Sequence, residues 1–107
     1  AADTRALIEE IGSPAFRLHL DVKAMCGGER HPIPQVIENN ADLLEHFHAN
    51  DKNMRGPGTG EIDFKPIAES LKRIGYTGYV SVEVFDYSPD PETIARDSLS
   101  YLRRTFA

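Results

Sequence analysis

The sequence of 107 residues contains little cysteine and no long apolar run. Cys26 is the single cysteine, which excludes an intramolecular disulfide and a zinc cluster built on several thiolates. Because a lone thiol is typical of a reducing compartment, we expect a cytoplasmic protein. Nowhere do about 18 apolar residues run together, and the N-terminus has no basic segment followed by an apolar one. We therefore predict no membrane anchor and no secretory signal.

Positive charge is also scarce. Twelve Lys and Arg residues stand against seventeen Asp and Glu residues, which leaves a formal net charge of -5. No basic run is present that could displace many counterions from a phosphate backbone, so a nucleic acid partner is not expected. With 40% hydrophobic and 27% charged residues, the composition is that of an ordinary globular protein. Residues 1–107 are interpreted as part of one domain.

Helical and strand patterns alternate along the chain, which predicts an α/β fold. Apolar residues recur at helical spacing in four segments, and alternation with period two marks three strands. Asp3, Asp63 and Asp90 precede helical segments as N-caps. The order αβαβαβα requires right-handed crossovers and a parallel sheet. We expect helices over 3–11, 34–41, 63–75 and 90–102, strands over 16–22, 43–49 and 79–85, and loops around Gly27-Gly28 and over 50–62.

Each predicted strand has one apolar and one polar face. Parallel sheets are normally covered on both faces, so a polar face needs an explanation. Polar residues gathered at the carboxyl ends of parallel strands are typical of the active-site end of a (β/α)₈ barrel. Three strands cannot close such a barrel, so we predict a partial TIM barrel made of its last three βα units. Strands from a missing N-terminal segment or from another copy of the chain would complete it.

Three residues of the predicted inner face have metal-ligand chemistry: Asp21, His48 and Glu83 lie in the carboxyl-terminal halves of successive strands. Neighbouring strands are about 4.8 Å apart, so two carboxylates and an imidazole can converge on one divalent cation. An oxygen-rich set without sulfur suits Mn²⁺ or Mg²⁺, with Co²⁺ and Zn²⁺ as alternatives. The competing interpretation is a polar layer or an ion pair inside the barrel without any metal.

Four runs in the chain also carry a family resemblance: Leu18–Met25, His46–Asp51, Gly56–Phe64 and Gly75–Glu83. In this order they resemble the sugar phosphate isomerase/epimerase family, whose members are xylose isomerase-like TIM barrels. The resemblance covers nearly the whole chain but corresponds only to the C-terminal part of that family. It implies a sugar or sugar phosphate as the substrate.

The resemblance also implies roles for individual residues. In ketose 3-epimerases of this superfamily, an aspartate, a histidine and a glutamate on the last three strands bind a metal together with a glutamate from an earlier strand. Asp21, His48 and Glu83 match the first three. From the ligand chemistry we expect Mn²⁺ in this chain. Glu83 would also be one of two carboxylates that exchange a proton next to a carbonyl while the metal stabilises an enediolate. The second carboxylate has no match, so we expect an incomplete metal shell and no epimerase activity from the isolated chain.

Substrate contacts are expected from three further residues. Arg55 resembles an arginine that contacts substrate hydroxyls or phosphate in relatives, although its register is offset by one residue. His19 and His46 share the inner face and are candidates for substrate binding, with packed, hydrogen-bonded histidines as the competing interpretation. Many relatives have a histidine three residues after the strand aspartate, where this chain has Ala24. Lys23 is a candidate substitute, although a solvated loop lysine is the more common outcome.

Other functions stay open on the same barrel. One is a dehydratase acting on a keto-inositol, and another is an endonuclease IV-like repair enzyme. The repair enzymes share the His-x-Asn-Asp run, but they carry a downstream Asp-x-His pair where this chain has Gly56-Pro57-Gly58. A third possibility is a half-barrel without catalytic activity that forms a homo-oligomer, because its open sheet edges and polar face need a cover.

Overall fold

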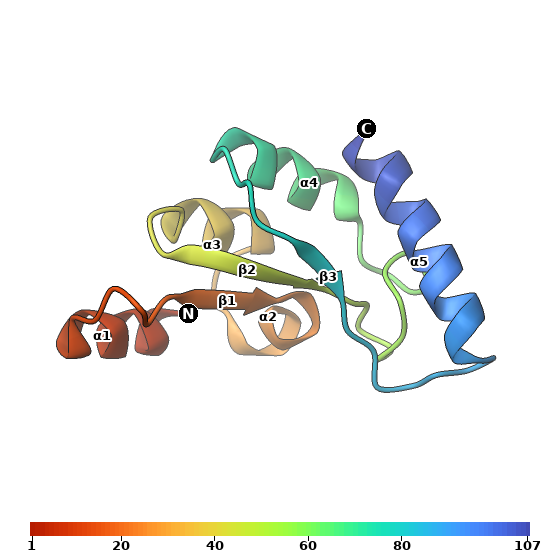
Figure 1. The fold of residues 1–107 in the computed structure, drawn as a ribbon, viewed down its shortest axis with the longest axis horizontal. Helices are drawn as coiled ribbons and strands as arrows, with labels where there is room; N and C mark the ends of the chain where they lie inside the picture. The colour runs from red at the N-terminus through yellow and green to blue at the C-terminus, as the bar shows by residue number, and fades with distance from the viewer.

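A computed structural model describes residues 1–107 and has a parallel sheet flanked by helices. The strands follow one another in the order β1-β2-β3, and both neighbouring pairs are parallel. Figure 1 shows α1 beside the start of β1, at one end of the molecule, and α5 at the other end beside β3. The elements are α1 (Ala2–Ile11), β1 (Leu18–Asp21), α2 (Val22–Gly28), α3 (Ile33–Asn39), β2 (Leu44–Ala49), α4 (Phe64–Arg73), β3 (Val80–Val82) and α5 (Pro91–Phe106).

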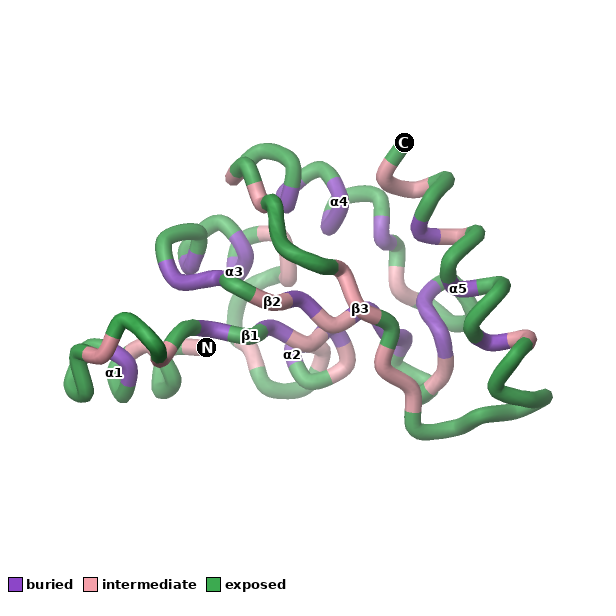
Figure 2. The backbone as a smooth tube through the Cα atoms, in the orientation of Figure 1, coloured by how far each residue is buried: buried purple, intermediate pink, exposed green.

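The hydrophobic core lies between one face of the sheet and the helices. Leu20 of β1 and Phe47 of β2 are buried, and they belong to one cluster with Ile37 of α3 and Leu71 of α4. Figure 2 shows buried segments along β1 and β2 and at intervals along α3, α4 and α5. The predicted apolar face of the strands is thus confirmed for β1 and β2. At β3 the pattern is weaker, because Val82 is 37% exposed.

The predicted α/β class and parallel sheet are confirmed, but the predicted loop after β1 is wrong. Residues Val22–Gly28 form helix α2, so the element order is αβααβαβα. Asp21 caps this helix by accepting a hydrogen bond from Ala24 N at 2.9 Å, and the buried Val22 and Met25 anchor it. The sequence analysis predicted a loop here because of Gly27 and Gly28, since glycine has a low helix propensity.

Element ends differ from the predictions by a few residues. The expected cap at Asp3 is wrong, since α1 begins at Ala2 and its N-cap is Ala1. The caps at Asp63 and Asp90 are confirmed, with Lys65 N and Thr93 N as the donors. All three strands are shorter than expected, because the interstrand hydrogen bonds end where the flanking loops and helices begin. No helix is both long and apolar enough to cross a lipid bilayer.

Candidate metal centre

The three predicted metal ligands come together at the carboxyl end of the sheet. Asp21 is the last residue of β1, His48 lies on β2, and Glu83 directly follows β3. The parallel register pairs Asp21 with His48, and it pairs His48 with Ser81. Glu83 continues this pairing, because its N–H donates to the carbonyl of Ala49 at 3.3 Å. The sheet register therefore places all three side chains on adjacent strands at the same edge.

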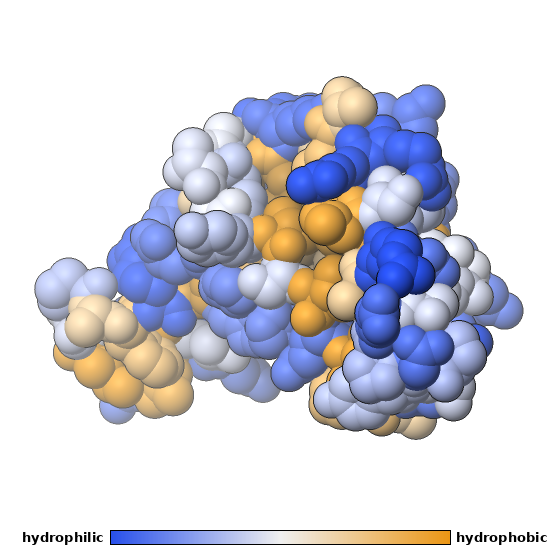
Figure 3. Space-filling view, turned by 45° about the vertical axis from the view of Figure 1, so that its right-hand side comes forward, coloured by the Kyte–Doolittle hydropathy of each residue, from blue (hydrophilic) through white to orange (hydrophobic).

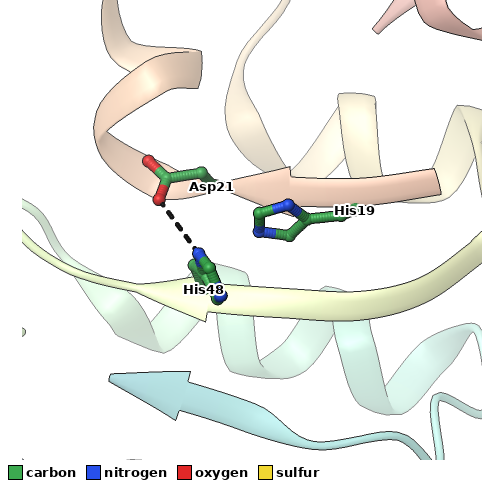
Figure 4. A group of neighbouring side chains, drawn as sticks. All are labelled: His19, Asp21 and His48. Carbon is green, nitrogen blue, oxygen red and sulfur yellow. Dashed lines mark ion pairs between the residues drawn. The ribbon is translucent and has the colours of Figure 1, made fainter. Parts of the chain in front are cut away.

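His48 lies between the two carboxylates. Its Nδ1 atom is 2.9 Å from Oε2 of Glu83 and 3.6 Å from Oδ2 of Asp21, the contact drawn in Figure 4. Neighbouring ligands of an octahedral cation with bonds near 2.1 Å lie about 3 Å apart. The two spacings are close to that value, and the set of two carboxylates and one imidazole has the donor chemistry of a Mn²⁺, Co²⁺ or Zn²⁺ site. The residues present thus fit a divalent cation.

His19 adds a second imidazole to this cluster. Its ring is 4.0 Å from the ring of His48, and ligating atoms of His19, Asp21 and His48 lie within 4.8 Å of one another. Burial lowers the pKa of His19, and the neighbouring His48 and His46 lower it further. A lowered pKa favours the neutral imidazole, which is the form that binds metals or accepts a hydrogen bond.

His46 completes a group of three histidine rings on this face. It lies 5.6 Å from His19 and 5.1 Å from His48, measured between ring centroids. Both pairs are in edge-to-face orientation. The structure therefore brings His19 and His46 next to the candidate metal ligands, as expected for residues of one barrel face. Their contact with a substrate stays a prediction.

Asn50 is a functional candidate to which the sequence analysis gave no role. It is fully buried just after β2, and its Nδ2 donates to Oδ2 of Asp21 at 2.9 Å. Its Oδ1 accepts a hydrogen bond from Lys23 N at 2.8 Å. With Ala24 N on Oδ1, both oxygens of Asp21 are held in place. The signal in the sequence was a polar pair, Asn50-Asp51, directly after the apolar end of a strand.

Asp51 organises the loop that follows β2. It is fully buried, and its carboxylate accepts hydrogen bonds from Lys52 N at 2.8 Å, Gly60 N at 3.1 Å and Ile62 N at 3.4 Å. A side chain at Gly60 would stand 2.4 Å from the Asp51 carboxylate, so this close approach requires glycine. The glycine-rich run is thus a shaped loop that leads into α4.

Arg55 lies in the same loop, and its guanidinium contacts the loop after β3. Its Nε and Nη2 donate to the carbonyl of Ser88, at 3.1 and 2.5 Å. In addition, the carbonyl of Met54 accepts hydrogen bonds from Phe85 N and Asp86 N, at 2.9 and 3.0 Å. These bonds join the loop after β2 to the loop after β3. Substrate binding by Arg55 stays a prediction, and its guanidinium already has a protein partner.

Comparisons with known proteins agree with this architecture. The family model described as a xylose isomerase-like TIM barrel matches residues 1–105. The chain is 39% identical over 75 residues to the 3-dehydro-D-guloside 4-epimerase of Escherichia coli, which corresponds to 70% of this chain and 29% of the relative. It is 33% identical over 85 residues to the D-psicose 3-epimerase of Agrobacterium fabrum, covering 79% of this chain and 29% of the relative.

A solved structure has the same fold over part of its chain. The apo crystal structure of the 3-keto-D-glucoside 4-epimerase from Escherichia coli superimposes with a TM-score of 0.87 at 35% identity. The match covers 96% of this chain and 39% of that one. The chain therefore spans less than a third of the length of the curated relatives above, and it matches a part of a TIM barrel.

Proposed function

The chain belongs to the xylose isomerase-like TIM barrel family, and on that premise we propose that it supplies the metal-binding strands of a sugar or sugar-phosphate isomerase or epimerase. The relatives named above are sugar epimerases, which supports this reaction class. The observation that carries the proposal is the convergence of Asp21, His48 and Glu83 at the carboxyl end of the sheet. In TIM barrels, this end is where active sites form.

We propose that these three residues hold one divalent cation, with Mn²⁺ preferred and Mg²⁺, Co²⁺ or Zn²⁺ as alternatives. When bound, such a cation polarises a substrate carbonyl and so makes the neighbouring C–H bond more acidic. Asp21 suits the holding role, because its side chain is only 16% exposed and both of its oxygens have hydrogen-bond donors. A carboxylate fixed in this way is a ligand rather than a mobile base.

Glu83 suits proton transfer. Its side chain is 43% exposed, so a substrate carbon can approach it. In an isomerase this carboxylate would take the proton from the carbon next to the carbonyl and return it to the former carbonyl carbon. In an epimerase it would exchange the proton on one face of the same carbon. Epimerisation also needs an acid on the opposite face of that carbon, and no matched residue of this chain supplies one. We therefore propose that the isolated chain binds metal without epimerase activity.

The rest of the barrel is also part of the proposal. A (β/α)₈ barrel needs eight strands, and this chain has three. We propose that the remaining strands come from a longer chain or from further copies in a homo-oligomer, and that the enzyme works in the cytoplasm on a sugar or sugar phosphate.

Native mass spectrometry of the chain with and without Mn²⁺ tests the metal site. We expect one bound Mn²⁺ per site in the unaltered chain and its loss in Asp21→Asn and in His48→Ala, because each variant removes one of three ligands. Removal of a ligand or its supporting partner typically weakens metal affinity by about 10- to 100-fold or more.

Matched controls are available on the surface of the same chain. Asp97 and His31 are exposed and make no side-chain hydrogen bond, so Asp97→Asn and His31→Ala should keep the metal. Unchanged metal content in both Asp21→Asn and His48→Ala would contradict the proposal. Loss of metal in the two control variants as well would mean that the ion is bound elsewhere on the acidic surface.

A further inference from the structure

Lys23 occupies an unusual place at the carboxyl end of the sheet. It is the second residue of α2, two positions after Asp21, and its side chain is half-buried. Its ammonium lies 5.8 Å from the centroid of the Phe85 ring, two residues after Glu83. The lysine and the ring thus reach toward each other from the ends of β1 and β3, the two outer strands, at the edge where the candidate metal ligands lie.

Both partners of this contact are fixed through their backbones. Lys23 N donates to Oδ1 of Asn50, whose other end holds Asp21. Phe85 N donates to the carbonyl of Met54 in the loop after β2. The backbone of Lys23 is therefore tied to Asn50, which also holds the candidate metal ligand Asp21, and the backbone of Phe85 is tied to the loop after β2.

The ammonium of Lys23 has no acceptor in the protein. It makes no hydrogen bond and no ion pair, although two carboxylates lie at the same sheet edge. Those carboxylates have other partners: Asp21 is held by Ala24 N and Asn50, and Glu83 is held by His48. The side chain of Lys23 is half-buried, and the three N–H groups of its ammonium have no protein acceptor, so they can donate to a ligand. An anionic oxygen is the acceptor that such an ammonium binds best.

We propose that Lys23 binds an anionic group of the sugar substrate, a phosphate or a carboxylate, and that Phe85 is the positioning residue for its ammonium. This proposal rests on the proposed function, because it assigns the substrate class of that same site. A substrate whose anionic group reached Lys23 while its carbonyl oxygen approached a cation on the candidate ligands would interact favourably with both positive charges. A ring contact of this kind keeps the ammonium in place while leaving its N–H groups free for the ligand.

The test is sugar binding to the ¹⁵N-labelled chain in the presence of Mg²⁺, followed by NMR shifts of the Lys23 and Phe85 amides. Three compounds are compared: D-ribulose 5-phosphate, hydroxypyruvate and neutral D-ribulose. We expect Lys23→Met to weaken binding of the anionic compounds by about tenfold, the effect of losing a charge-assisted hydrogen bond, and to leave D-ribulose unchanged. The two anionic compounds distinguish a phosphate from a carboxylate as the preferred group.

Three further variants separate recognition from folding. Lys23→Arg keeps the charge and should retain most of the affinity. Phe85→Leu should weaken binding of the anionic compounds less than Lys23→Met, because it removes the positioning ring and keeps the ammonium. Lys65→Met removes an exposed lysine of α4 and should change nothing. Amide spectra of all variants show whether each one is folded.

Several results would overturn the proposal. These are equal affinity of Lys23→Met and the unaltered chain for the anionic compounds, an equal loss for neutral D-ribulose, or no binding of any anionic compound. Failure of the proposed function looks different: anion binding at Lys23 would persist while Asp21→Asn and His48→Ala left the metal content unchanged. If those variants lost the metal and the Lys23 variants bound both the neutral sugar and the anionic compounds like the unaltered chain, the proposed function would stand. The role of Lys23 would then be refuted.

Discussion

At the scale of single residues, hydrogen bonds hold the candidate metal ligand Asp21 in place. Asp21 is held by Ala24 N and Asn50, which donate to its two oxygens. Fixed ligands need little reorganisation when a cation binds, which is a source of affinity and of specific geometry. Asn50 is the residue on which this order depends most, because it links Asp21 to the backbone of Lys23.

Asn50→Ala should therefore lower both stability and metal affinity. The variant leaves Lys23 N without its acceptor and Asp21 with one donor fewer, at a buried position. We expect the free energy of unfolding to fall by about 1–3 kcal/mol, as for other buried hydrogen-bond partners that are removed. Urea denaturation measures the first effect, and a Mn²⁺ titration measures the second.

Asn39→Ala is the matched control for this prediction, because Asn39 is exposed at the end of α3 and its side chain makes no hydrogen bond. It should change neither quantity. An Asn50→Ala variant that bound Mn²⁺ as tightly as the unaltered chain would show that Asn50 stabilises the fold but does not support metal binding.

At the scale of elements, the loop after β2 fits against α5 at its glycines. A side chain at Gly56 would stand 2.3 Å from Oγ of Ser98, and one at Gly58 would meet the ring of Tyr101 at 2.5 Å. Gly58 also has a φ of +85°, which favours glycine. This loop carries Met54 and Arg55, which hold the loop after β3. The packing of α5 thereby sets the position of the segment that contains Glu83 and Phe85.

Gly56→Ala should destabilise the chain, because the added methyl group would overlap with buried Ser98 on α5. Overpacking of this kind costs about 1–3 kcal/mol. Gly27→Ala is the opposite case, since Gly27 lies inside α2 with no atom within 4 Å of the added carbon. There we expect a gain of about 0.5–1 kcal/mol from helix propensity.

Thermal or urea denaturation of the two glycine variants measures both effects in one experiment. The two changes in stability should have opposite signs. If Gly56→Ala were as stable as the unaltered chain, the close contact between this loop and α5 would not exist in solution.

At the scale of the whole molecule, three strands leave a barrel sheet with two open edges. The edge of β3 is poorly covered, with Tyr79 81% exposed. Helix α1 exposes Leu7 and Ile11, and Figure 3 shows apolar surface at that end of the molecule and in a band near its middle. Open edges and apolar surface favour association with further strands.

We therefore expect the isolated chain to self-associate in a concentration-dependent way. The double variant Leu7→Glu/Ile11→Glu should weaken this association, because it places charge on the apolar end formed by α1. Ala6→Glu is the control, since Ala6 is exposed on the same helix and adds the charge without removing a large apolar side chain. Sedimentation velocity measures the assembly state, and a monomer at every concentration would refute the expectation.

The sequence by itself determined the class of fold, the parallel order of three strands and the identity of the polar face. Period-two alternation in strands such as Leu18-His19-Leu20-Asp21 carries that information locally, because successive side chains must point to opposite faces. The helix N-caps at Asp63 and Asp90 could also be read from the local sequence, because a cap depends only on residues next to it in the chain. Helix α2 could not be predicted from the local sequence. Its two glycines have a low helix propensity, and burial of Val22 and Met25 stabilises the helix in the folded chain.

Only the tertiary structure decided how the site is held together. The contacts of Asn50 with Asp21 and Lys23 join positions 27 to 29 residues apart, and they exist because the sheet register places the ends of β1 and β2 side by side. The same holds for Arg55 on Ser88 and for Lys23 over Phe85. A sequence pattern specifies which face a side chain joins, whereas its partners depend on register and loop packing, which are properties of the folded chain.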